Sequence, residues 1–563
     1  MEDLIYKYAL QNAIKYGGKA NAGSVIAKVV AEDPSLKNEM KQLGKSIALI
    51  LKKVNSMKIE KQAEELKKIA PDLLEEKKRT EERTLPPLPN AGSKVVLRVA
   101  PYPSGPLHIG NAKQVILNDE YAKIYKGKLI LVMDDTIGSE EKAIEPEAYD
   151  LIIDGLKWLG VNFDKNIIYK SDRLEIYYKH AEEIIHLGAA YVCNCPAELL
   201  RENRKKSIAC GCRNRTVSQN LDEWREMLRG KYSEGSAVLR IRTDINHPNP
   251  AFRDRILFRI SEREHPRTKN KYNVWPMLEF SWAVDDVFLG ITHVIRGKEL
   301  MIESDMERFI WNILNWKGPE LLHSGLLTIE GVKLSKSKSR DEVKKGIYSG
   351  WDDPRTWSLQ SLKRRGFKSG AIRNFCLSFG LHEKESHVTV DKFYAENRKL
   401  IEPEANRYFF VEDPVEMVIQ GAPEKEVSLR LHPDFPERGS RKFLTSGKFL
   451  VSKKDFGKLE NGMINRLMDC LNFTKKGKEF VFHSENYEKY KNSKNKGMII
   501  HYVPAENFVN AEVIMDDGRI SKCAAESSVV GLKPGDIVQA ERMFYCVLDS
   551  VNEGVYNFWF MHP

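Results

Sequence analysis

The fold of this chain is decided by the stretch Arg98-Val-Ala-Pro-Tyr-Pro-Ser-Gly-Pro-Leu-His108-Ile-Gly110-Asn111. The apolar run at 95–99 is typical of a buried strand, the prolines and Gly105 end it, and a helical pattern begins near Asn111. Strand, turn and helix start form a phosphate-binding unit, because the free N–H groups and the helix dipole favour negative charge. Gly110 would let a ligand approach the backbone, and His108 would donate to it. The stretch matches neither G-x-G-x-x-G nor the P-loop, and alone it could be an ordinary proline-rich turn.

A second stretch, Gly331-Val-Lys333-Leu-Ser335-Lys336-Ser337-Lys-Ser339, is a loop of small residues that carries several ammonium groups. Lysines on a flexible, serine-rich loop suit a mobile clamp on a polyphosphate leaving group. A solvated basic loop is the alternative when this stretch is considered by itself.

Together and in this order, the two stretches resemble the H-I-G-H and K-M-S-K-S signatures of class I aminoacyl-tRNA synthetases. The surrounding sequence resembles, more narrowly, the glutamyl-tRNA synthetase family in its archaeal/eukaryotic form, which has a glutaminyl-type C-terminal half. The resemblance covers nearly the whole chain. Asn111 stands in place of the second signature histidine, so its role toward phosphate remains open, although an amide can still form hydrogen bonds.

The length, charge and hydropathy of the chain limit the classes of protein to which it can belong. The 563 residues are enough for several domains, and 89 basic against 79 acidic residues give a net charge of +10, which permits nucleic-acid binding without requiring it. No segment approaches the length of a transmembrane span, and Met1-Glu-Asp-Leu does not begin a signal peptide. We therefore expect a soluble, cytoplasmic protein.

The expected fold class is a multidomain α/β protein with five parts. These are an N-terminal helical domain (1–84), a stiff proline-rich linker (85–93), a Rossmann-type parallel-sheet catalytic domain (94–340) with an acceptor-stem insertion (172–275), a helical stem-contact region (341–400) and C-terminal β-barrels (401–563). Within the catalytic domain the pattern predicts a helix at 111–126, strands at 128–133 and 167–169, and a sheet that resumes over 274–286 and 290–297. The barrels are expected from short alternating segments separated by Gly, Asn, Asp and Pro turns.

Four of the eight cysteines fall in two C-x-C pairs, Cys193/Cys195 and Cys210/Cys212, on either side of a short basic helix at 196–208. Two such pairs can present four thiolates to one tetrahedral Zn²⁺. No catalytic partner accompanies them, so a structural zinc is predicted. Four free core thiols are the alternative.

The resemblance implies roles for the active-site residues. His108 and Lys336, with Lys333, are implied as catalytic, and the implied ATP-binding set is Pro101, His108, Gly110, Asn111, Lys333, Ser335 and Lys336. Arg98 is expected to contact the substrate's side-chain carboxylate and Asp134 its ammonium. At two pocket positions, Leu278 and Trp282 replace the tyrosine and asparagine of bacterial members, so no contact is inferred for them.

Arg296 is the residue expected to select glutamate over glutamine. Arg98 occurs in both glutamyl and glutaminyl relatives, whereas glutamyl relatives alone have arginine at position 296. A second guanidinium compensates a second carboxylate, and beside a neutral amide it would be left unpaired. The alternative is that Arg296 pairs with Asp285, Asp286 or Glu299 and only braces its strand.

The predicted tRNA contacts are Arg364 and Arg365 in the stem-contact region and Arg438 and Arg441 near the anticodon. Each of these could equally belong to a solvated charged surface. The implied reaction joins L-glutamate to tRNA(Glu) through a glutamyl-adenylate, with Mg²⁺ accompanying ATP, and tRNA is expected to be needed before activation. A glutaminyl-tRNA synthetase, or a non-catalytic tRNA-binding relative, is the alternative, and the sequence leaves open whether tRNA(Gln) is also charged.

Overall fold

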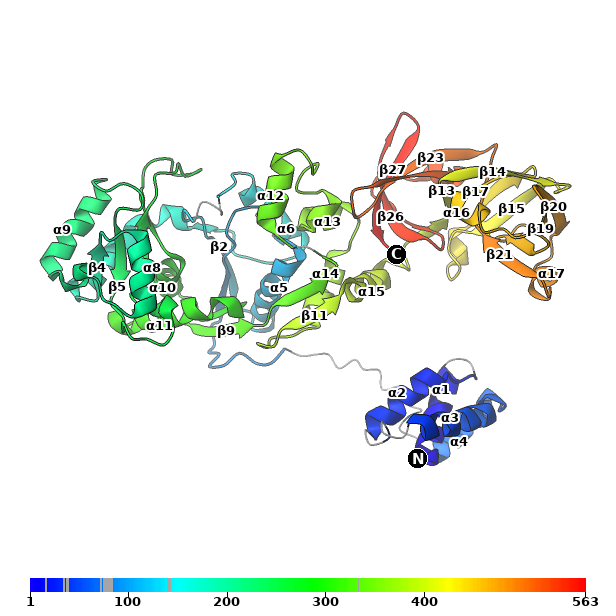
Figure 1. The fold of residues 1–563 in the computed structure, drawn as a ribbon, viewed down its shortest axis with the longest axis horizontal. Helices are drawn as coiled ribbons and strands as arrows, with labels where there is room; N and C mark the ends of the chain where they lie inside the picture. The colour runs from blue at the N-terminus through cyan, green and yellow to red at the C-terminus, as the bar shows by residue number, and fades with distance from the viewer. Residues whose placement is uncertain are drawn as a thin grey trace. The chain divides into compact units, whose positions relative to one another are not determined.

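The computed structural model describes residues 1–15, 18–33, 36, 40–70, 73, 85–138, 143–332 and 334–563. The chain forms two compact units, Met1–Leu85 and Pro86–Pro563 (Figure 1). In the part of the chain that is described, no helix is both long and apolar enough to cross a membrane.

The regular structure described in the first unit is all helical. Its helices are α1 (Glu2–Lys15), α2 (Ala22–Glu32), α3 (Met40–Asn55) and α4 (Ile59–Ile69). Ile5, Ala9 and Ala13 recur every fourth residue, so they share one face of α1, and they are buried in the core of this unit. The predicted N-terminal helical region is confirmed.

The second unit begins with a parallel sheet whose strands are buried. The strands β1 (Val96–Val99), β2 (Lys128–Met133) and β3 (Ile168–Tyr169) pair in that order, and α5 (Ile109–Ile124) and α6 (Ala148–Trp158) connect them. The parallel pair β8 (His293–Gly297) and β9 (Glu320–Ser324) lies beside β1, because the N–H of Thr292 donates to the carbonyl of Val96 at 2.9 Å. The predicted Rossmann-type parallel sheet is confirmed.

One expectation for this sheet is wrong. The sequence was expected to return to the sheet over 274–286, but only β7 (Val274–Pro276) is a strand there, and α10 (Leu278–Phe288) follows it. The helix is buried almost all round, so its sequence shows no amphipathic period and cannot be told from a buried strand by its pattern.

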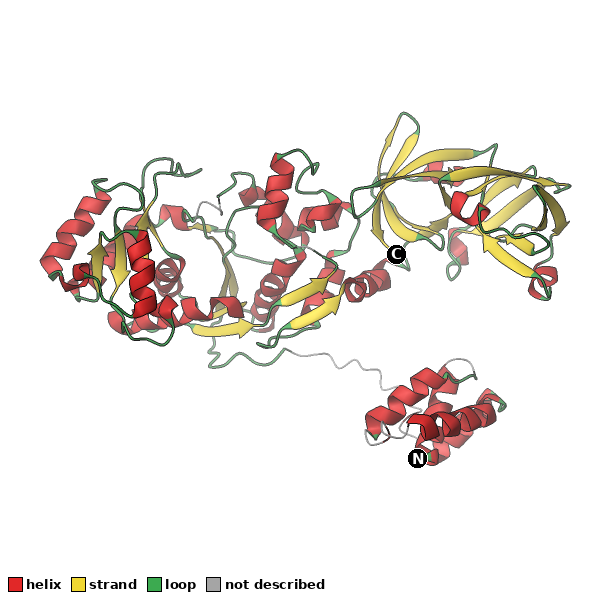
Figure 2. Cartoon of the chain, in the orientation of Figure 1, coloured by secondary structure: helices red, strands yellow, loops and turns green. Residues whose placement is uncertain are grey.

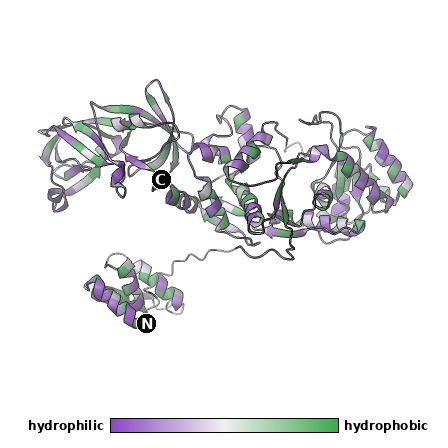
Figure 3. Cartoon of the chain, turned by 180° about the vertical axis from the view of Figure 1, so that it is seen from behind, coloured by the Kyte–Doolittle hydropathy of each residue, from purple (hydrophilic) through white to green (hydrophobic). Residues whose placement is uncertain are grey.

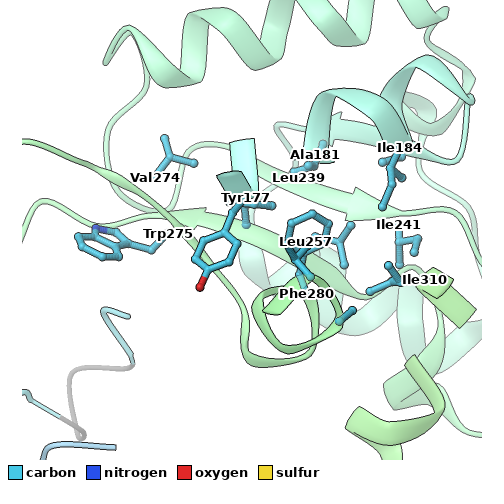
Figure 4. Close-up of a cluster of buried hydrophobic side chains, with 14 of the residues drawn as sticks. Tyr177, Ala181, Ile184, Leu239, Ile241, Leu257, Val274, Trp275, Phe280 and Ile310 are labelled. Atoms are coloured by element: carbon cyan, nitrogen blue, oxygen red, sulfur yellow. The ribbon is translucent and has the colours of Figure 1, made fainter. Parts of the chain in front are cut away.

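The insertion is a four-stranded antiparallel sheet covered by helices. Its elements are α7 (Leu174–His186), β4 (Ala190–Cys193), α8 (Ala197–Lys206), α9 (Val217–Leu228), β5 (Val238–Ile241), β6 (Ile256–Ile260) and β7, with the strands in the order β4-β5-β6-β7. Its apolar cluster includes Tyr177 and Leu257 together with Phe280 of α10 (Figure 4). The same cluster contains Val294 of β8, so the insertion and the parallel sheet share one core.

The segment 351–359 pins the turn between β1 and α5. The carbonyl of Leu107 accepts from the N–H of Leu359 at 2.8 Å, and the N–H of Ile109 donates to the carbonyl of Trp357. Gly105 has a positive φ, and a Cβ there would lie 2.7 Å from the indole of Trp351, so only glycine fits. The surrounding elements are α11 (Met301–Leu314), β10 (Leu327–Glu330), α12 (Lys336–Lys344), α13 (Leu359–Arg364), α14 (Ser369–Leu377), β11 (Ser386–Thr389) and α15 (Val390–Ile401).

The regular structure of the C-terminal part is mostly strands (Figure 2). Two seven-stranded sheets, β12-β25-β26-β27-β23-β24-β13 and β21-β18-β19-β20-β14-β17-β22, enclose separate apolar cores, and a two-stranded ribbon of β15 and β16 completes it. The strands are β12 (Asn406–Tyr408), β13 (Phe410–Glu412), β14 (Pro414–Gln420), β15 (Lys425–Arg430), β16 (Ser440–Thr445), β17 (Lys448–Ser452), β18 (Ile464–Leu467), β19 (Asn472–Lys476), β20 (Glu479–Ser484), β21 (Lys496–Ile500), β22 (Val503–Pro504), β23 (Phe508–Ile514), β24 (Ile520–Glu526), β25 (Ile537–Ala540), β26 (Phe544–Asn552) and β27 (Val555–His562). Hydrophilic and hydrophobic residues alternate along them (Figure 3), as in β16, where alternate residues are buried. The predicted barrel-like sheets are confirmed.

Arg365 joins the helical region to the last strand. Its side chain is fully buried at the end of α13, and its Nε and Nη2 donate to the carbonyls of Phe560 and Met561 at 3.0 and 2.7 Å. Arg365 was predicted to contact tRNA. That prediction is wrong, because a guanidinium with no exposed surface cannot reach a phosphate.

We expect Arg365→Met to destabilise the second unit by about 2 kcal/mol, because two buried carbonyls lose a charged donor. The midpoint of urea unfolding, followed by tryptophan fluorescence, measures the effect. Lys363→Met is the control, since Lys363 is exposed and pairs with Asp154 on the surface, where pairs contribute little. Equal midpoints for the two variants would contradict the structural role of Arg365.

Candidate active site

His108 caps the start of α5 with its own ring. Its Nδ1 accepts a hydrogen bond from the backbone N–H of Gly110 at 3.1 Å. Burial, with the positive charge of Lys336, lowers the pKa of His108 to about 3, so the ring is neutral at pH 7. Because Nδ1 is an acceptor, the ring proton lies on Nε2, which can donate to a phosphate oxygen.

Asn111 completes the same cap. Its Oδ1 accepts from the backbone N–H of His108 at 3.3 Å, which with the His108–Gly110 bond makes a capping box. The asparagine in place of a signature histidine therefore orients His108. A Cβ on Gly110 would lie 2.9 Å from Cδ1 of Leu334 and 3.0 Å from the His108 ring, so a side chain here would displace both residues, and the lysine stretch packs against the start of α5.

The second half of the lysine stretch, predicted to be a flexible loop, is the start of helix α12. Lys333 lies outside the described residues, so its role stays a prediction. Ser335 caps α12 by accepting from the N–H of Lys338, and Lys336 is the first residue of that helix. Burial lowers the pKa of Lys336 to about 8. Two helix starts, one carrying a neutral imidazole donor and one an ammonium, therefore approach each other, and both favour an anion.

Asp134 and Asp135 follow β2 directly but differ in their surroundings. The N–H of Asp134 donates to the carbonyl of Pro101 at 3.0 Å, and its Oδ1 lies 3.1 Å from Nζ of Lys170. Asp135 is fully buried and accepts from Ser171 N–H, Ser171 Oγ and the hydroxyl of Tyr149. Asp135 therefore holds the backbone at Ser171 and lies 3.7 Å from Nε of Arg267, while Asp134 faces Lys170.

Four ion pairs lie among the parallel strands, the segments that follow them and the neighbouring helices, and all of their side chains are buried except that of Arg173, which is 16% exposed. We call these eight residues the ion-pair cluster: Arg98–Asp286, Lys170–Asp134, Arg173–Asp285 and Arg296–Glu307. The contacts are short, for example 2.7 Å between Arg173 Nε and Asp285 Oδ1. Tyr177 donates to Asp285 at 2.6 Å. Buried charges require partners of this kind, since an unpaired one is strongly destabilising.

Three of these cations contact the indole ring of Trp282. Arg98 Cζ lies 4.6 Å from the ring centroid, Arg296 Cζ 4.9 Å and Lys170 Nζ 4.9 Å. Cations are attracted to an aromatic face, more strongly when water is excluded. Trp282 is 5% exposed, and its Nε1 has no hydrogen-bond partner. The three residues predicted to bind substrate, Arg98, Asp134 and Arg296, thus belong to one cluster around this ring.

Arg296 has a partner that the sequence did not suggest. Its Nη1 and Nη2 donate to both carboxylate oxygens of Glu307 at 2.8 and 2.9 Å, and Nη2 also donates to Ser304 Oγ. The sequence predicted that Arg296 either pairs with Asp285, Asp286 or Glu299, or selects glutamate because it would be left unpaired beside the neutral side chain of glutamine. The partner is instead Glu307, and because of this pair Arg296 would not be left unpaired beside glutamine. Lys170, Ser304 and Glu307 carry no sequence signature and were missed.

The four cysteines of the two C-x-C pairs converge. Their sulfurs all lie within 4.8 Å of one another, with 3.6 Å between Cys193 and Cys210 and 3.9 Å between Cys195 and Cys212. Four sulfurs about 2.3 Å from a central Zn²⁺ would be about 3.8 Å apart, so this cluster has the size of a tetrahedral metal site. Arg240 donates to Cys210 Sγ at 3.6 Å, as expected of a group that stabilises thiolates.

The other predicted tRNA-binding arginines are already engaged. Arg441 is 4% exposed and pairs with Glu526 and Glu541, so the prediction that it contacts tRNA is wrong. Arg438 is half-buried and donates to the carbonyls of Pro403 and Glu404. Arg364 is 37% exposed and pairs with Asp352 and Asp549, and it keeps a solvent-facing surface.

The geometry defines a nucleotide-binding α/β protein. The starts of α5 and α12 lie close together, and a cluster of arginines and carboxylates follows the parallel strands. A family profile described as the catalytic domain of class I tRNA synthetases (E and Q) matches residues 94–403, and the anticodon-binding domain of the same family matches residues 405–490. The chain belongs to this family.

Two curated relatives agree with this assignment. A protein of Pyrococcus furiosus named glutamate–tRNA ligase is 45% identical over 98% of this chain and 98% of its own length. A glutamate–tRNA ligase of Methanothermobacter marburgensis is 42% identical over the full length of both chains. A crystal structure of glutamate–tRNA synthetase from Elizabethkingia anophelis overlaps 56% of this chain and 72% of that chain at 22% identity, with a TM-score of 0.41. The resemblance inferred from the two signatures is confirmed by the family profiles and the curated relatives.

Proposed function

We propose that this protein ligates L-glutamate to the 3′-terminal ribose of tRNA(Glu) at the expense of ATP. The observation that carries the proposal is the approach of the His108-capped start of α5 to the Lys336 start of α12, which together make a site for phosphates. Membership of the class I (E and Q) family and the curated relatives named glutamate–tRNA ligase support the same reaction. The reaction is placed in the cytoplasm, where these substrates meet.

The chemistry proceeds in two displacements. A glutamate α-carboxylate oxygen forms a bond to the α-phosphorus of Mg-ATP while the bond to pyrophosphate breaks, which gives glutamyl-adenylate. The terminal 2′-hydroxyl of the tRNA then attacks the acyl carbon and AMP leaves. Such reactions need positioning and charge neutralisation: His108 Nε2 and the N–H groups of α5 receive the phosphates, and Lys336, with Lys333, stabilises the pyrophosphate.

The ion-pair cluster supplies the amino-acid site. Arg98 and Arg296, which contact one indole, bind the side-chain carboxylate, and Asp134 binds the ammonium. For the tRNA, Arg364 and Arg438 remain candidates for phosphate contacts, whereas Arg365 and Arg441 do not. A glutaminyl-tRNA synthetase is the second candidate, because Glu307 already neutralises Arg296, and a neutral substrate would then leave no buried charge unpaired.

Charging assays with purified tRNA(Glu) and tRNA(Gln), each with glutamate and with glutamine, test the proposal. Because the site contains the two guanidiniums of Arg98 and Arg296, we expect glutamate to be joined to tRNA(Glu) at least a hundredfold faster than glutamine. Preferential glutamine charging would favour the second candidate. Absence of ATP–pyrophosphate exchange in the presence of tRNA would leave only a non-catalytic binding protein.

Lys336→Ala should slow adenylate formation about a hundredfold, because the ammonium contacts charge that grows in the transition state, a contribution of about 3 kcal/mol. Single-turnover activation measures this, and ATP affinity should change much less. Lys338→Ala, which removes an exposed lysine two residues further along α12, is the matched control. If the two variants react at equal rates, the lysine stretch is only a solvated surface.

We further propose that the four-cysteine cluster holds one structural Zn²⁺, with Cys193, Cys195, Cys210 and Cys212 as ligands. The fit of the sulfur spacing to a tetrahedron supports this. The metal would fasten both ends of α8 to the insertion sheet and would take no part in the chemical steps.

Elemental analysis should find about one zinc per chain, and Cys210→Ser should lose the metal, because three thiolates bind it far more weakly. The same substitution at Cys376, a buried cysteine outside the cluster, should leave the zinc content unchanged. A metal-free wild-type protein that is folded and active would end the zinc proposal.

A further inference from the structure

The ion-pair cluster is electrically balanced before any substrate binds. Each of its four cations, Arg98, Lys170, Arg173 and Arg296, has its own carboxylate. Glutamate brings one ammonium and two carboxylates, so its binding would leave one surplus negative charge among buried groups. Glutamine is neutral overall and would leave none. A surplus buried charge is costly, so the cluster as paired needs an adjustment in order to accept glutamate.

The Arg296–Glu307 pair is the place where a second carboxylate can be accommodated. Glu307 occupies the Nη1 and Nη2 end of the guanidinium, and Ser304 binds Nη2 from the side. Arg296 Nε is buried and has no hydrogen-bond partner. Nε is therefore the donor of this guanidinium that is left for a substrate carboxylate while Glu307 keeps its place, and the groups that cover Nε must move aside as the substrate binds. Two carboxylates would then share one guanidinium, which favours a proton on one of them.

The surroundings of Glu307 make it the acceptor for that proton. Glu307, on α11, is fully buried, and the charged groups facing it are Arg296 of β8, Arg98 of β1 and Asp286 of α10. On its remaining side lie Ser304 of the same helix and His323 of β9, whose Nε2 is 2.7 Å from Ser304 Oγ. Burial, together with Asp286, raises the pKa of Glu307 to about 7. Burial also raises the pKa of Asp285, but that carboxylate has more partners, because Arg173 and the hydroxyl of Tyr177 donate to it and Lys170 lies near it.

We propose that Glu307 takes up one proton from solvent when glutamate binds, so that the protonated carboxyl and the substrate carboxylate share Arg296. The inference rests on the proposed function, since it places the glutamate side chain at Arg296. No bond of the substrate changes in this step: one hydrogen ion moves from water to a Glu307 oxygen, and the cluster stays neutral. Glu307 thereby tunes the amino-acid preference without reacting.

Calorimetry on the full-length protein tests the proton uptake directly. Glutamate binding is measured at pH 7.5 in two buffers that differ in ionisation enthalpy, with tRNA present if binding requires it. We expect uptake of roughly one proton per glutamate by the wild type and close to none with glutamine. The wild-type measurement needs no variant, so it decides the matter even if a substitution at Glu307 fails to fold. Wild-type binding of glutamate without proton uptake would overturn the proposal.

The variant Glu307→Gln tests whether Glu307 is the residue that takes up the proton, because the amide has the size of the carboxyl group and is always neutral. Its kcat/KM for glutamate should equal that of the wild type near pH 6 and exceed it increasingly at higher pH, by up to about tenfold per pH unit above the pKa, since only the wild type must take up the proton. The substrate amine and Lys336 titrate alike in both proteins and cancel in this ratio. Glutamate binding by the variant should take up no proton.

The matched control is Glu299→Gln, the same change at an exposed carboxylate three residues from Arg296. It should behave as the wild type at every pH. A ratio of Glu307→Gln to wild type that does not vary with pH, or equal proton uptake by both, would show that Glu307 only braces Arg296. These results are independent of the charging assay, in which preference for glutamine would instead reject the proposed function.

Discussion

The burial of Arg98, Lys170 and Arg296, with Arg173 half-buried beside them, is the constraint on which the active site depends. A buried ion without a partner is strongly destabilising, and here each cation has a carboxylate from a different element, with three of the cations in contact with Trp282. The pairs connect β1 to α10 and β8 to α11. The cluster thus fixes the helices against the sheet and contains the same groups that are proposed to bind the amino acid.

The local elements could be predicted because they depend on neighbouring residues. The apolar run of β2 was predicted with its observed bounds, and the glycine-proline turn before α5 follows from the residues that break a strand. The cysteine pairs could also be recognised by their spacing. Pairings such as Arg296–Glu307 could not be predicted in this way, since both residues look ordinary in sequence and meet only because β8 and α11 pack together.

The basic run Lys363-Arg364-Arg365 shows where a charge pattern misleads. Successive residues of a helix point in different directions, and these three side chains reach Asp154, Asp549 and the backbone of β27. Arg364 and Arg365 were both predicted to contact tRNA, whereas Lys363 is exposed and weakly paired, Arg364 bridges to the C-terminal sheet and Arg365 is buried. Whether a cation faces solvent depends on which face of the helix meets its neighbour, and a stretch of three residues does not contain that information.

Helix α13 connects the C-terminal sheets to the proposed phosphate site through a continuous series of contacts. Arg365 at the end of α13 holds the last strand, and Leu359 at its beginning donates to Leu107, the residue before His108. Arg355, close by, packs against Gly518 in the turn between β23 and β24. Because α13 is only six residues long and both its ends are fixed by hydrogen bonds, it cannot absorb a displacement of β27 by bending. A shift of β27 would therefore also move the turn that orients His108, unless the hydrogen bonds at the two ends of α13 prevent the shift.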